Sequence, residues 1–463
     1  MDVNIQEVLK ATGGVVLEKK AVSSSWQINK ISTDTRTIEK DDLFFALEGE
    51  KFDAHDFLEE AATKGAKHLV VSKPKSVSEK IRKHLNVIVV EDTLKAYGDL
   101  AKFYRQKFKI PVIAITGSSG KTTVKEILAH LLSSKYKVLK NRGTENNRIG
   151  VPKTIFQLEP SHEALVLEIG TSEPGEIERL SSIVAPQIGI LTMIGPSHLE
   201  GLGSLEGVRE EKMKIILGLE RGGKLILNGE DLMLKGAQSG THRLIRFGFS
   251  NENADWIAEQ IWSHEKGCNF QVNGKEMYET QLFGRHNVLN ALAAIIAASH
   301  LEVEAPALQK ALASFKPVTG RFNLKEVEGI TFIDDSYNSN PGSLQAALET
   351  LKNFKTRGRK GIVIGDMLEL GQKSEELHRQ MGKLAASLPL DYIIAAGPLS
   401  AYFAEEALSQ GYPTSKLHEA KDSDEAGQIL KKLAQAGDMV LVKGSRGMRM
   451  EKVFECYTTS FTR

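Results

Sequence analysis

The stretch PVIAITGSSGKTTVKEILAHLL, residues 111–132, joins an apolar β-rich run to an amphipathic helical pattern through a glycine-containing turn. Such a turn directs backbone N–H groups and the positive end of the helix dipole toward one place. We expect Lys121 to supply positive charge for the outer phosphates of a nucleotide and Thr122 to supply a hydroxyl for Mg²⁺. The stretch therefore predicts an ATP- or GTP-binding site.

The spacing of this turn departs from the common phosphate-binding loop. That loop has a further glycine five positions before Gly120, and Ile115 stands there in this chain. By spacing alone the match is incomplete, and the alternative is a glycine-rich turn that binds nothing. The strand before the turn, the helix after it and the Lys-Thr-Thr run favour the nucleotide site.

The length of 463 residues suggests about three domains, at roughly 100 to 200 residues each. Residues 1–108 mix short strand-like runs with helical patterns and predict a small α/β unit. In residues 109–317, apolar runs such as VIAIT and ALVLEIG alternate with helical segments, which is typical of a parallel sheet covered on both faces. After a Pro- and Gly-containing hinge, FKPVTGRFN, residues 318–463 predict a doubly wound, Rossmann-like domain.

The composition limits the partners of the chain. A net charge of +1, from 60 basic and 59 acidic residues, gives no field that would attract nucleic acid or an anionic membrane. The polar start MDVNIQEVLKATGG and the short apolar runs predict a chain that is neither exported nor inserted in a membrane. Two cysteines are too few for a disulfide framework or a thiolate metal site. We therefore expect a cytoplasmic protein.

Three charged residues of the middle region are candidates for a metal site. Glu168 closes the run ALVLEIG, where a sheet presents ligands, although exposed glutamates at loop edges are equally common. His198 follows the run QIGILTMIG and is either a metal ligand or an ordinary hydrogen-bonded histidine. Lys212 follows two glutamates in a helical pattern, and its spacing alone indicates a solvated lysine.

Polar groups also gather in the second half of the chain. Asn287 could cap the helix of LFGRHNVLNALAAIIAA or meet a base edge, and capping is the commoner role. Arg321 in the hinge could reach a phosphate or only decorate a linker. The segment VKGSRG, residues 442–447, suggests anion contacts, although lysine and serine in loops are usually solvated. The segment IDDSYNSNPGSL is either a polar turn or a ligand-binding site. It places four hydrogen-bonding side chains at a strand end: Asp334, Asp335, Asn338 and Asn340.

Taken together, these segments resemble one family, the bacterial Mur ligases, over essentially the whole chain. The resemblance rests on TGSSGKTT, NNRIGVP, EIGTSEPGEI, SHLEGLGSLEGVREEK, GRHNVLNALAA, DDSYNSNPGSL, GDMLELG, VKGSRGMRME and, near the start, DTRTIEKDDLFFALEGEKFDAHDF. The family uses a shortened loop, T-G-x-x-G-K-[ST], which accounts for the unusual spacing. Among its members, the chain is most similar to those that add D-Ala-D-Ala.

The resemblance implies a role for each candidate residue. Lys121 would bind phosphate, Thr122 and Glu168 would hold a magnesium ion, His198 would hold a second one, and Lys212 would be carbamylated by carbon dioxide. The remaining ATP contacts would come from Gly117, Ser118, Ser119, Gly120, Thr123, Asn287 at the adenine, and Arg321 and Asp335 at the phosphates or ribose. The contacts to the other substrates would come from Asp34, Thr35, Arg36, Asp53 and His55 at the UDP end, and from Asn146, Asn147, Asn338 and Asn340.

One residue departs from the family pattern. The family commonly has G-N-x-N-N before the reacting carboxylate, whereas Thr144 follows Gly143 here. The contact that the first Asn makes in the family therefore has no direct equivalent in this sequence.

The resemblance implies an ATP-dependent ligase that uses ATP and Mg²⁺, and we expect it to work as a monomer. It would join D-Ala-D-Ala to UDP-MurNAc-tripeptide through an acyl phosphate, in cytoplasmic peptidoglycan precursor synthesis. One alternative is a related ligase that adds a single amino acid, or glutamates to folate. Another is a P-loop regulatory GTPase or motor, although the longer glycine spacing and an N-K-x-D motif are absent from the sequence. A catalytically silent binding protein is the third.

Overall fold

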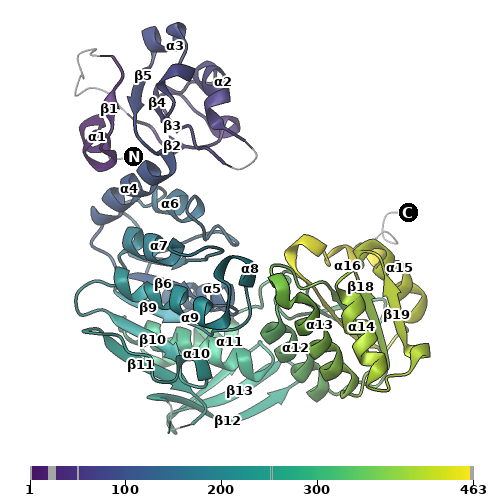
Figure 1. The fold of residues 1–463 in the computed structure, drawn as a ribbon. Helices are drawn as coiled ribbons and strands as arrows, with labels where there is room; N and C mark the ends of the chain where they lie inside the picture. Colours follow the sequence, from purple (N-terminus) through teal and green to yellow (C-terminus); the bar gives the residue numbers. More distant parts are fainter. Residues whose placement is uncertain (1–2, 19–27, 50–51, 251, 253, 459–463) are drawn as a thin grey trace.

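The computed structural model describes residues 3–18, 28–49, 52–250, 252 and 254–458. Figure 1 shows an α/β unit at the N-terminal end, a larger middle unit, and a C-terminal unit packed beside the middle one. Glu50 and Lys51 of the predicted UDP-sugar segment lie outside the described residues, as do the extreme ends of the first and last predicted domains. The three predicted domain boundaries remain predictions.

The N-terminal unit is built on a sheet with the strand order β1-β5-β4-β3-β2. Its strands are parallel except for β1, which pairs antiparallel with β5. Figure 1 shows α4 at the junction with the middle unit, where it packs on α6 and α7. The strands are β1 (Val15–Val16), β2 (Ile31–Ser32), β3 (Leu43–Phe45), β4 (His68–Val71) and β5 (Asn86–Val89). The helices are α1 (Ile5–Thr12), α2 (Leu58–Thr63), α3 (Glu79–His84) and α4 (Thr93–Gln106).

The middle unit contains a sheet with the strand order β14-β13-β12-β11-β10-β9-β6-β8-β7. Its parallel part, from β7 to β12, agrees with the prediction from the apolar runs. The strands are β6 (Val112–Thr116), β7 (Val138–Lys140), β8 (Ala164–Glu168), β9 (Ile188–Leu191), β10 (Lys224–Asn228), β11 (Arg243–Gly248), β12 (Trp256–His264), β13 (Gly267–Val272) and β14 (Glu276–Thr280). The helices are α5 (Lys121–Leu132), α6 (Gly150–Ile155), α7 (Glu176–Val184), α8 (Leu199–Leu202), α9 (Leu205–Met213), α10 (Arg285–Ser299) and α11 (Ala305–Ser314).

The end of this sheet differs from the prediction of parallel strands alone. β12, β13 and β14 form an antiparallel meander that extends the sheet. Asn273 and Gly274 join the last two strands with positive φ angles of 50° and 68°. An Asn-Gly pair adopts this geometry readily, and Lys275 completes a three-residue connection between the two strands.

The strand that leads into the glycine turn is buried on both faces. Ile113 and Ile115 pack in one apolar cluster with residues of α5 and α10, whereas Val112 and Ala114 pack in another with residues of α4 and α7. Each of these four side chains is fully buried. A strand covered on both sides cannot shift easily, and it therefore fixes the position of the turn that follows it.

The C-terminal unit has the strand order β15-β16-β20-β17-β18-β19, with β15 antiparallel and the others parallel. Helix α13 packs against both α12 and α14, while α15 packs against α16, β18 and β19. The strands are β15 (Asn323–Val327), β16 (Ile330–Asp335), β17 (Lys360–Gly365), β18 (Tyr392–Ala396), β19 (Leu417–Ala420) and β20 (Met439–Lys443). The helices are α12 (Pro341–Asn353), α13 (Ser374–Ala386), α14 (Ser400–Ser409), α15 (Ser423–Leu433) and α16 (Lys452–Thr458). The predicted α/β fold class is confirmed.

The C-terminal unit contacts the middle unit at the glycine turn. The amide of Asn340 donates a hydrogen bond to the carbonyl of Ser118 over 3.3 Å, and Arg321 Nη2 lies 3.4 Å from Thr122 Oγ1. Both contacts lie near the carboxyl ends of parallel strands, which is where open α/β sheets bind ligands. Across the part of the chain that the structure describes, no helix is long and apolar enough to cross a membrane.

Candidate active site

The glycine turn between β6 and α5 can be formed only with glycine at two positions. Gly117 has a φ of 146°, and a Cβ atom there would lie 1.9 Å from Thr192 Oγ1. Gly120 has a φ of 83°, and its Cβ would lie 2.5 Å from Asn290 Oδ1. The turn therefore has the backbone of a loop that can approach an anion closely.

Lys121 begins α5, directly after the turn. Its Nζ donates to the carbonyl of Gly117 over 2.7 Å, so the ammonium group folds back over the loop. Burial lowers the pKa of Lys121, and the nearby Arg321 lowers it further, while Glu168 opposes the shift. A phosphate would be a better partner for this charge than a neutral carbonyl.

Thr122 and Glu168 form a pair of oxygen donors beside the loop. Thr122 Oγ1 donates to Glu168 Oε2 over 2.8 Å, and the amide of Asn146 donates to Glu168 Oε1 over 2.7 Å. Glu168 is buried at the end of β8. Mg²⁺ in nucleotide sites usually takes one or two protein oxygens together with water and phosphate.

A dedicated metal cage is not needed for that arrangement. Within the described ranges, no group of three or more His, Cys, Asp and Glu residues could hold a metal ion. The Thr122–Glu168 pair nevertheless fits an ion that is shared with a nucleotide. The predicted magnesium roles of these two residues remain predictions.

Lys212 is fully buried on α9, and its Nζ is buried with no hydrogen-bond partner. The expectation from spacing alone, a solvated helix lysine, is therefore wrong. Burial lowers the pKa of Lys212 well below its ordinary value, and nearby Lys121 lowers it further against the opposing charges of Glu211 and Glu168. Glu211 bonds the backbone N–H groups of residues 175 and 177 instead. A buried amine without a partner is costly, so this position calls for a bound or covalent partner.

His198 connects the middle unit to the C-terminal unit. It adopts a left-handed backbone with a φ of 51°, and its Nδ1 lies 2.6 Å from Glu369 Oε2. His198 beside Glu369 lowers the pKa of that carboxyl. Sequence reasoning missed Glu369 as a functional candidate, although it lies in the segment GDMLELG. The predicted second metal site at His198 remains a prediction.

The turn between β16 and α12 forms the opposite wall. Asn340 caps α12 by accepting from the N–H of Ser343 over 2.9 Å, in addition to its contact with Ser118. The carbonyl of Asn338 accepts from Lys443 Nζ over 3.0 Å. Between this turn and the glycine loop lies a cavity of about 390 Å³. Its lining includes Ser118, Ser119, Gly120, Lys121, Thr122, Thr123, Asn146, Asn147, Glu168, His198, Arg321, Asn338 and Asn340.

Two of the predicted ATP contacts, Asn287 and Asp335, bond to residues that do not line the cavity. The amide of Asn287 is buried and donates to the carbonyl of Phe283 over 2.9 Å, so it does not cap α10, whose N-cap is Gly284. Asp335 accepts from Lys443 Nζ over 2.6 Å and from the N–H of Phe322 over 3.1 Å. Neither residue lines the cavity with the loop. Their contacts to adenine and to phosphate or ribose remain predictions.

The predicted UDP contacts form a separate set in the N-terminal unit. Asp34 pairs with the guanidinium of Arg36 at 2.7 Å, and this contact lowers the pKa of Asp34 to about 2. Asp53 lies 2.6 Å from His55 Nδ1 and 2.6 Å from Lys73 Nζ. Thr35 donates to Glu60 over 2.9 Å. These partners order the segment, and its role in binding UDP remains a prediction.

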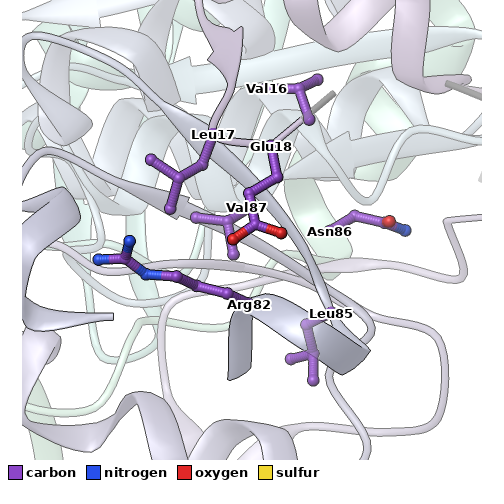
Figure 2. Close-up of a pocket in the computed structure, with 7 residues that line it drawn as sticks. All are labelled: Val16, Leu17, Glu18, Arg82, Leu85, Asn86 and Val87. Atoms are coloured by element: carbon purple, nitrogen blue, oxygen red, sulfur yellow. The ribbon is translucent and has the colours of Figure 1, made fainter. Parts of the chain in front are cut away.

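Figure 2 shows a second hollow in the N-terminal unit, beside β1, β5 and α3. The apolar side chains of Val16, Leu17, Leu85 and Val87 form most of it. The guanidinium of Arg82 donates to the carbonyls of residues 74 and 77. None of the five predicted UDP contacts lines this hollow, so it does not overlap the predicted substrate segment.

Known proteins place these features in a family. The family description "Mur ligase middle domain" matches residues 115–298, "Mur ligase, glutamate ligase domain" matches 320–446, and "Mur ligase family, catalytic domain" matches 27–105. A Bacillus subtilis protein named UDP-N-acetylmuramoyl-tripeptide--D-alanyl-D-alanine ligase is 36% identical over 452 residues, 97% of this chain and 96% of that one. The chain belongs to the Mur ligase family. An Escherichia coli protein of the same name is 36% identical to this Mur ligase, over 92% of this chain and 93% of that one.

Solved structures agree with the sequence relatives. MurF from Acinetobacter baumannii superimposes on this Mur ligase with a TM-score of 0.88 at 32% identity, covering 98% of each chain. MurF from Thermotoga maritima, solved in complex with ADP, gives a TM-score of 0.84 at 29% identity over 94% of this chain and 98% of that one. The order of the three units along the chain is therefore that of a Mur ligase throughout.

Proposed function

We propose that this Mur ligase joins D-Ala-D-Ala to UDP-MurNAc-tripeptide and converts ATP to ADP and phosphate. The names of relatives that match nearly the whole chain support this assignment. The observation that carries it is the shared cavity, which brings the phosphate loop, the Thr122–Glu168 pair and the C-terminal turn at Asn338–Asn340 together. A nucleotide and two other substrates need such a junction to react with one another.

In the first step, a carboxylate oxygen of the tripeptide attacks the γ-phosphorus of ATP. A bond forms between the carboxylate oxygen and the γ-phosphorus, and the bond from that phosphorus to the bridging oxygen of the β-phosphate breaks. ADP leaves, and the peptide keeps the γ-phosphate as an acyl phosphate. Because both reactants are anions, the step needs positive charge around the transferring group. Lys121 at the loop and Arg321, 3.4 Å from Thr122, supply that charge.

Magnesium would be held by Thr122 and Glu168, with Asn146 orienting the carboxylate. Bound Mg²⁺ supplies charge neutralisation to the phosphate oxygens in reactions of this kind. Thr122 donates a hydrogen bond to Glu168, so the oxygens of the two side chains lie close together. We propose a second ion at His198 in addition.

We propose that Lys212 carries a carbamate. Its buried, unpartnered amine has a lowered pKa, so the neutral form with a free lone pair is favoured. The nitrogen bonds to the carbon of carbon dioxide, one oxygen takes the negative charge, and the proton leaves to solvent. The product places an anion near Lys121, in place of a neutral amine. Carbon-13 NMR with labelled bicarbonate should give a carbamate resonance that is absent from Lys212→Gln; the same spectrum in both proteins would contradict it.

In the second step, the amine of D-Ala-D-Ala attacks the acyl carbon and the carbon–oxygen bond to phosphate breaks. The amide forms as phosphate leaves with the proton that the nitrogen loses. An acyl phosphate hydrolyses in water, so the cavity has to be closed while the intermediate exists. The Asn340–Ser118 and His198–Glu369 contacts hold the C-terminal unit against the loop. They support a closed arrangement in which water is excluded.

We further propose that the chain acts as a monomer in the cytoplasm, where ATP and the UDP-linked substrate are supplied. Cys268 and Cys456 are not disulfide-bonded, which is compatible with a reducing compartment. Size-exclusion chromatography with light scattering would test the monomer, and a mass near 51 kDa is expected for the 50.9 kDa chain. A mass twice as large would contradict it.

The proposed function is tested by ADP release with UDP-MurNAc-tripeptide as the acceptor. We expect rapid release with D-Ala-D-Ala and at least a hundredfold slower release with D-Ala or L-Lys alone. Phosphate release that requires both substrates would exclude a regulatory GTPase and a silent binding protein. Activity with a single amino acid and none with the dipeptide would overturn the assignment in favour of another ligase of the family.

A further inference from the structure

The side chain of Tyr337 contacts three separate parts of the cavity wall. The guanidinium carbon of Arg321 lies 4.2 Å from the centre of its ring, and that of Arg446 lies 5.6 Å away. Its hydroxyl lies 2.5 Å from Thr144 Oγ1. A tyrosine ring attracts guanidinium groups through its negative face, so one residue holds two cations and one hydroxyl partner.

Thr144 belongs to the middle unit, in the loop that also carries Asn146. Since Asn146 donates to Glu168, the loop connects the Thr144–Tyr337 contact to the proposed metal pair. The two hydroxyls belong to different units of the fold, so their bond forms only when those units are together. Thr144 is also the residue that departs from the family pattern, and the structure gives it a partner.

The backbone beside Arg321 is fixed by the same tyrosine. The N–H of Tyr337 donates to the carbonyl of Gly320 over 3.2 Å. Gly320 has a φ of 73°, and a Cβ there would lie 3.2 Å from Tyr337 Cβ. Tyr337 thus contacts both the backbone beside Arg321 and its guanidinium group. That guanidinium reaches toward Thr122.

Arg446 reaches the cavity from the C-terminal unit. Its Nη1 is 2.7 Å from Glu451, and its side chain lines the same cavity as Tyr337 and Asn338. A dipeptide brings a carboxylate of its own, which requires a cation that is not occupied by phosphate. Arg446 provides such a cation away from the loop lysine, and Tyr337 fixes its position.

We propose that Tyr337 is a positioning residue for the ligation. It holds Arg321 for the phosphate and Arg446 for the incoming dipeptide carboxylate, and its bond to Thr144 keeps the cavity closed while the acyl phosphate exists. This inference rests on the proposed function. When the bond is lost, water enters and ATP is consumed without amide formation, so the ratio of phosphate to amide rises.

Two single variants and their double variant test the closure. Tyr337→Phe removes only the hydroxyl and keeps the ring, and Thr144→Val removes the partner hydroxyl. We expect each to lower kcat/KM for D-Ala-D-Ala about tenfold and to raise the phosphate-to-amide ratio above one. The double variant should be no worse than either single variant, because both remove the same bond. Thr144→Ser keeps a hydroxyl and should rescue the coupling.

A third variant and a control complete the design. Tyr337→Leu removes the ring as well, so it should also weaken ADP binding about tenfold, whereas Tyr337→Phe should change it less than twofold. Thr356→Val removes a threonine hydroxyl bond to the carbonyl of Gly437, far from this contact, and should change neither quantity. Multiplicative effects of the two hydroxyl deletions, or full coupling in Tyr337→Phe, would overturn the proposal.

The outcome separates this inference from the proposed function. If the parent protein does not join D-Ala-D-Ala, the proposed function fails. The same double-variant cycle, measured as the radius of gyration of the ADP-bound protein by X-ray scattering, would still test the closure. Expansion in both single variants, with no further expansion in the double variant, is expected, and an unchanged radius in all three would contradict the contact's role.

Discussion

Replacing Lys443 by methionine tests how the C-terminal wall of the cavity is stabilised. Lys443 ends β20, and its Nζ lies 2.6 Å from Asp335 Oδ2 and 3.0 Å from the carbonyl of Asn338. The lysine side chain is 2% exposed and that of Asp335 13% exposed. Burial lowers the pKa of Lys443 and raises that of Asp335, while the charge of each opposes the shift of the other. Lys443→Met leaves Asp335 buried without its cation.

The size of the stability loss in Lys443→Met follows from the burial of an unpaired Asp335 carboxylate. Removing one partner of a buried ion pair costs about 3–5 kcal/mol, whereas replacing both partners is much less costly. Lys443→Met with Asp335→Asn should therefore be more stable than Lys443→Met alone. The cost should also grow with pH. The folded pKa of Asp335 in Lys443→Met is raised, so stability is lost as pH rises above the unfolded pKa of about 3.9.

Amide hydrogen exchange in β16 and β20 is the suitable assay, because a chain with several units need not unfold in one step. Protection in these strands should fall in Lys443→Met by a factor of about a hundred to several thousand, converted at 1.36 kcal/mol per tenfold. The loss should be greater at pH 7.5 than at pH 5. Unchanged protection, or a double variant less stable than Lys443→Met, would refute the reasoning.

Three other predictions concern the loop, the hinge and a histidine of α10. Lys121→Ala should lower ligation at least a thousandfold, because it removes the loop cation, with Lys316→Ala as the control; activity within tenfold of the parent would contradict its role. Gly320→Ala places a side chain at a φ of 73° against Tyr337, so turnover should fall more than ATP affinity, and an equal loss of both would count against a hinge. Burial, with a contribution from Lys443, lowers the pKa of His286 to about 4, so the unfolded chain binds this proton first as pH falls below about 6.5. Urea denaturation without nucleotide should show that the unfolding free energy of the parent falls by up to about 2 kcal/mol between pH 7 and pH 5. His286→Gln should keep this free energy, and equal losses in both proteins would exclude the effect.

The local parts of the site could be predicted from the sequence. The phosphate loop lies within 22 residues, and its strand, its two glycines and its helix can each be recognised from the local sequence. The α/β alternation predicted the fold class for the same reason. The Asn273-Gly274 turn was also a local signal, and recognising it would have indicated the antiparallel meander of β12–β14.

Long-range packing decided the parts that could not be predicted. Lys212 looks like a surface lysine in its helix, and only the packing of α9 buries it. The partners Glu369 and Tyr337 lie more than 150 residues from His198 and Thr144, with which they form contacts between units. No spacing rule connects residues so far apart in the chain. The resemblance to the family located the segments but not these contacts.

The most direct test of the account follows an oxygen atom. UDP-MurNAc-tripeptide labelled with oxygen-18 in its terminal carboxylate is incubated with ATP, D-Ala-D-Ala and the protein, and the released phosphate is analysed by mass spectrometry. Attack of the carboxylate on the γ-phosphorus predicts one labelled oxygen in each phosphate, released together with the amide product. Unlabelled phosphate accompanied by amide would contradict an acyl phosphate in this cavity.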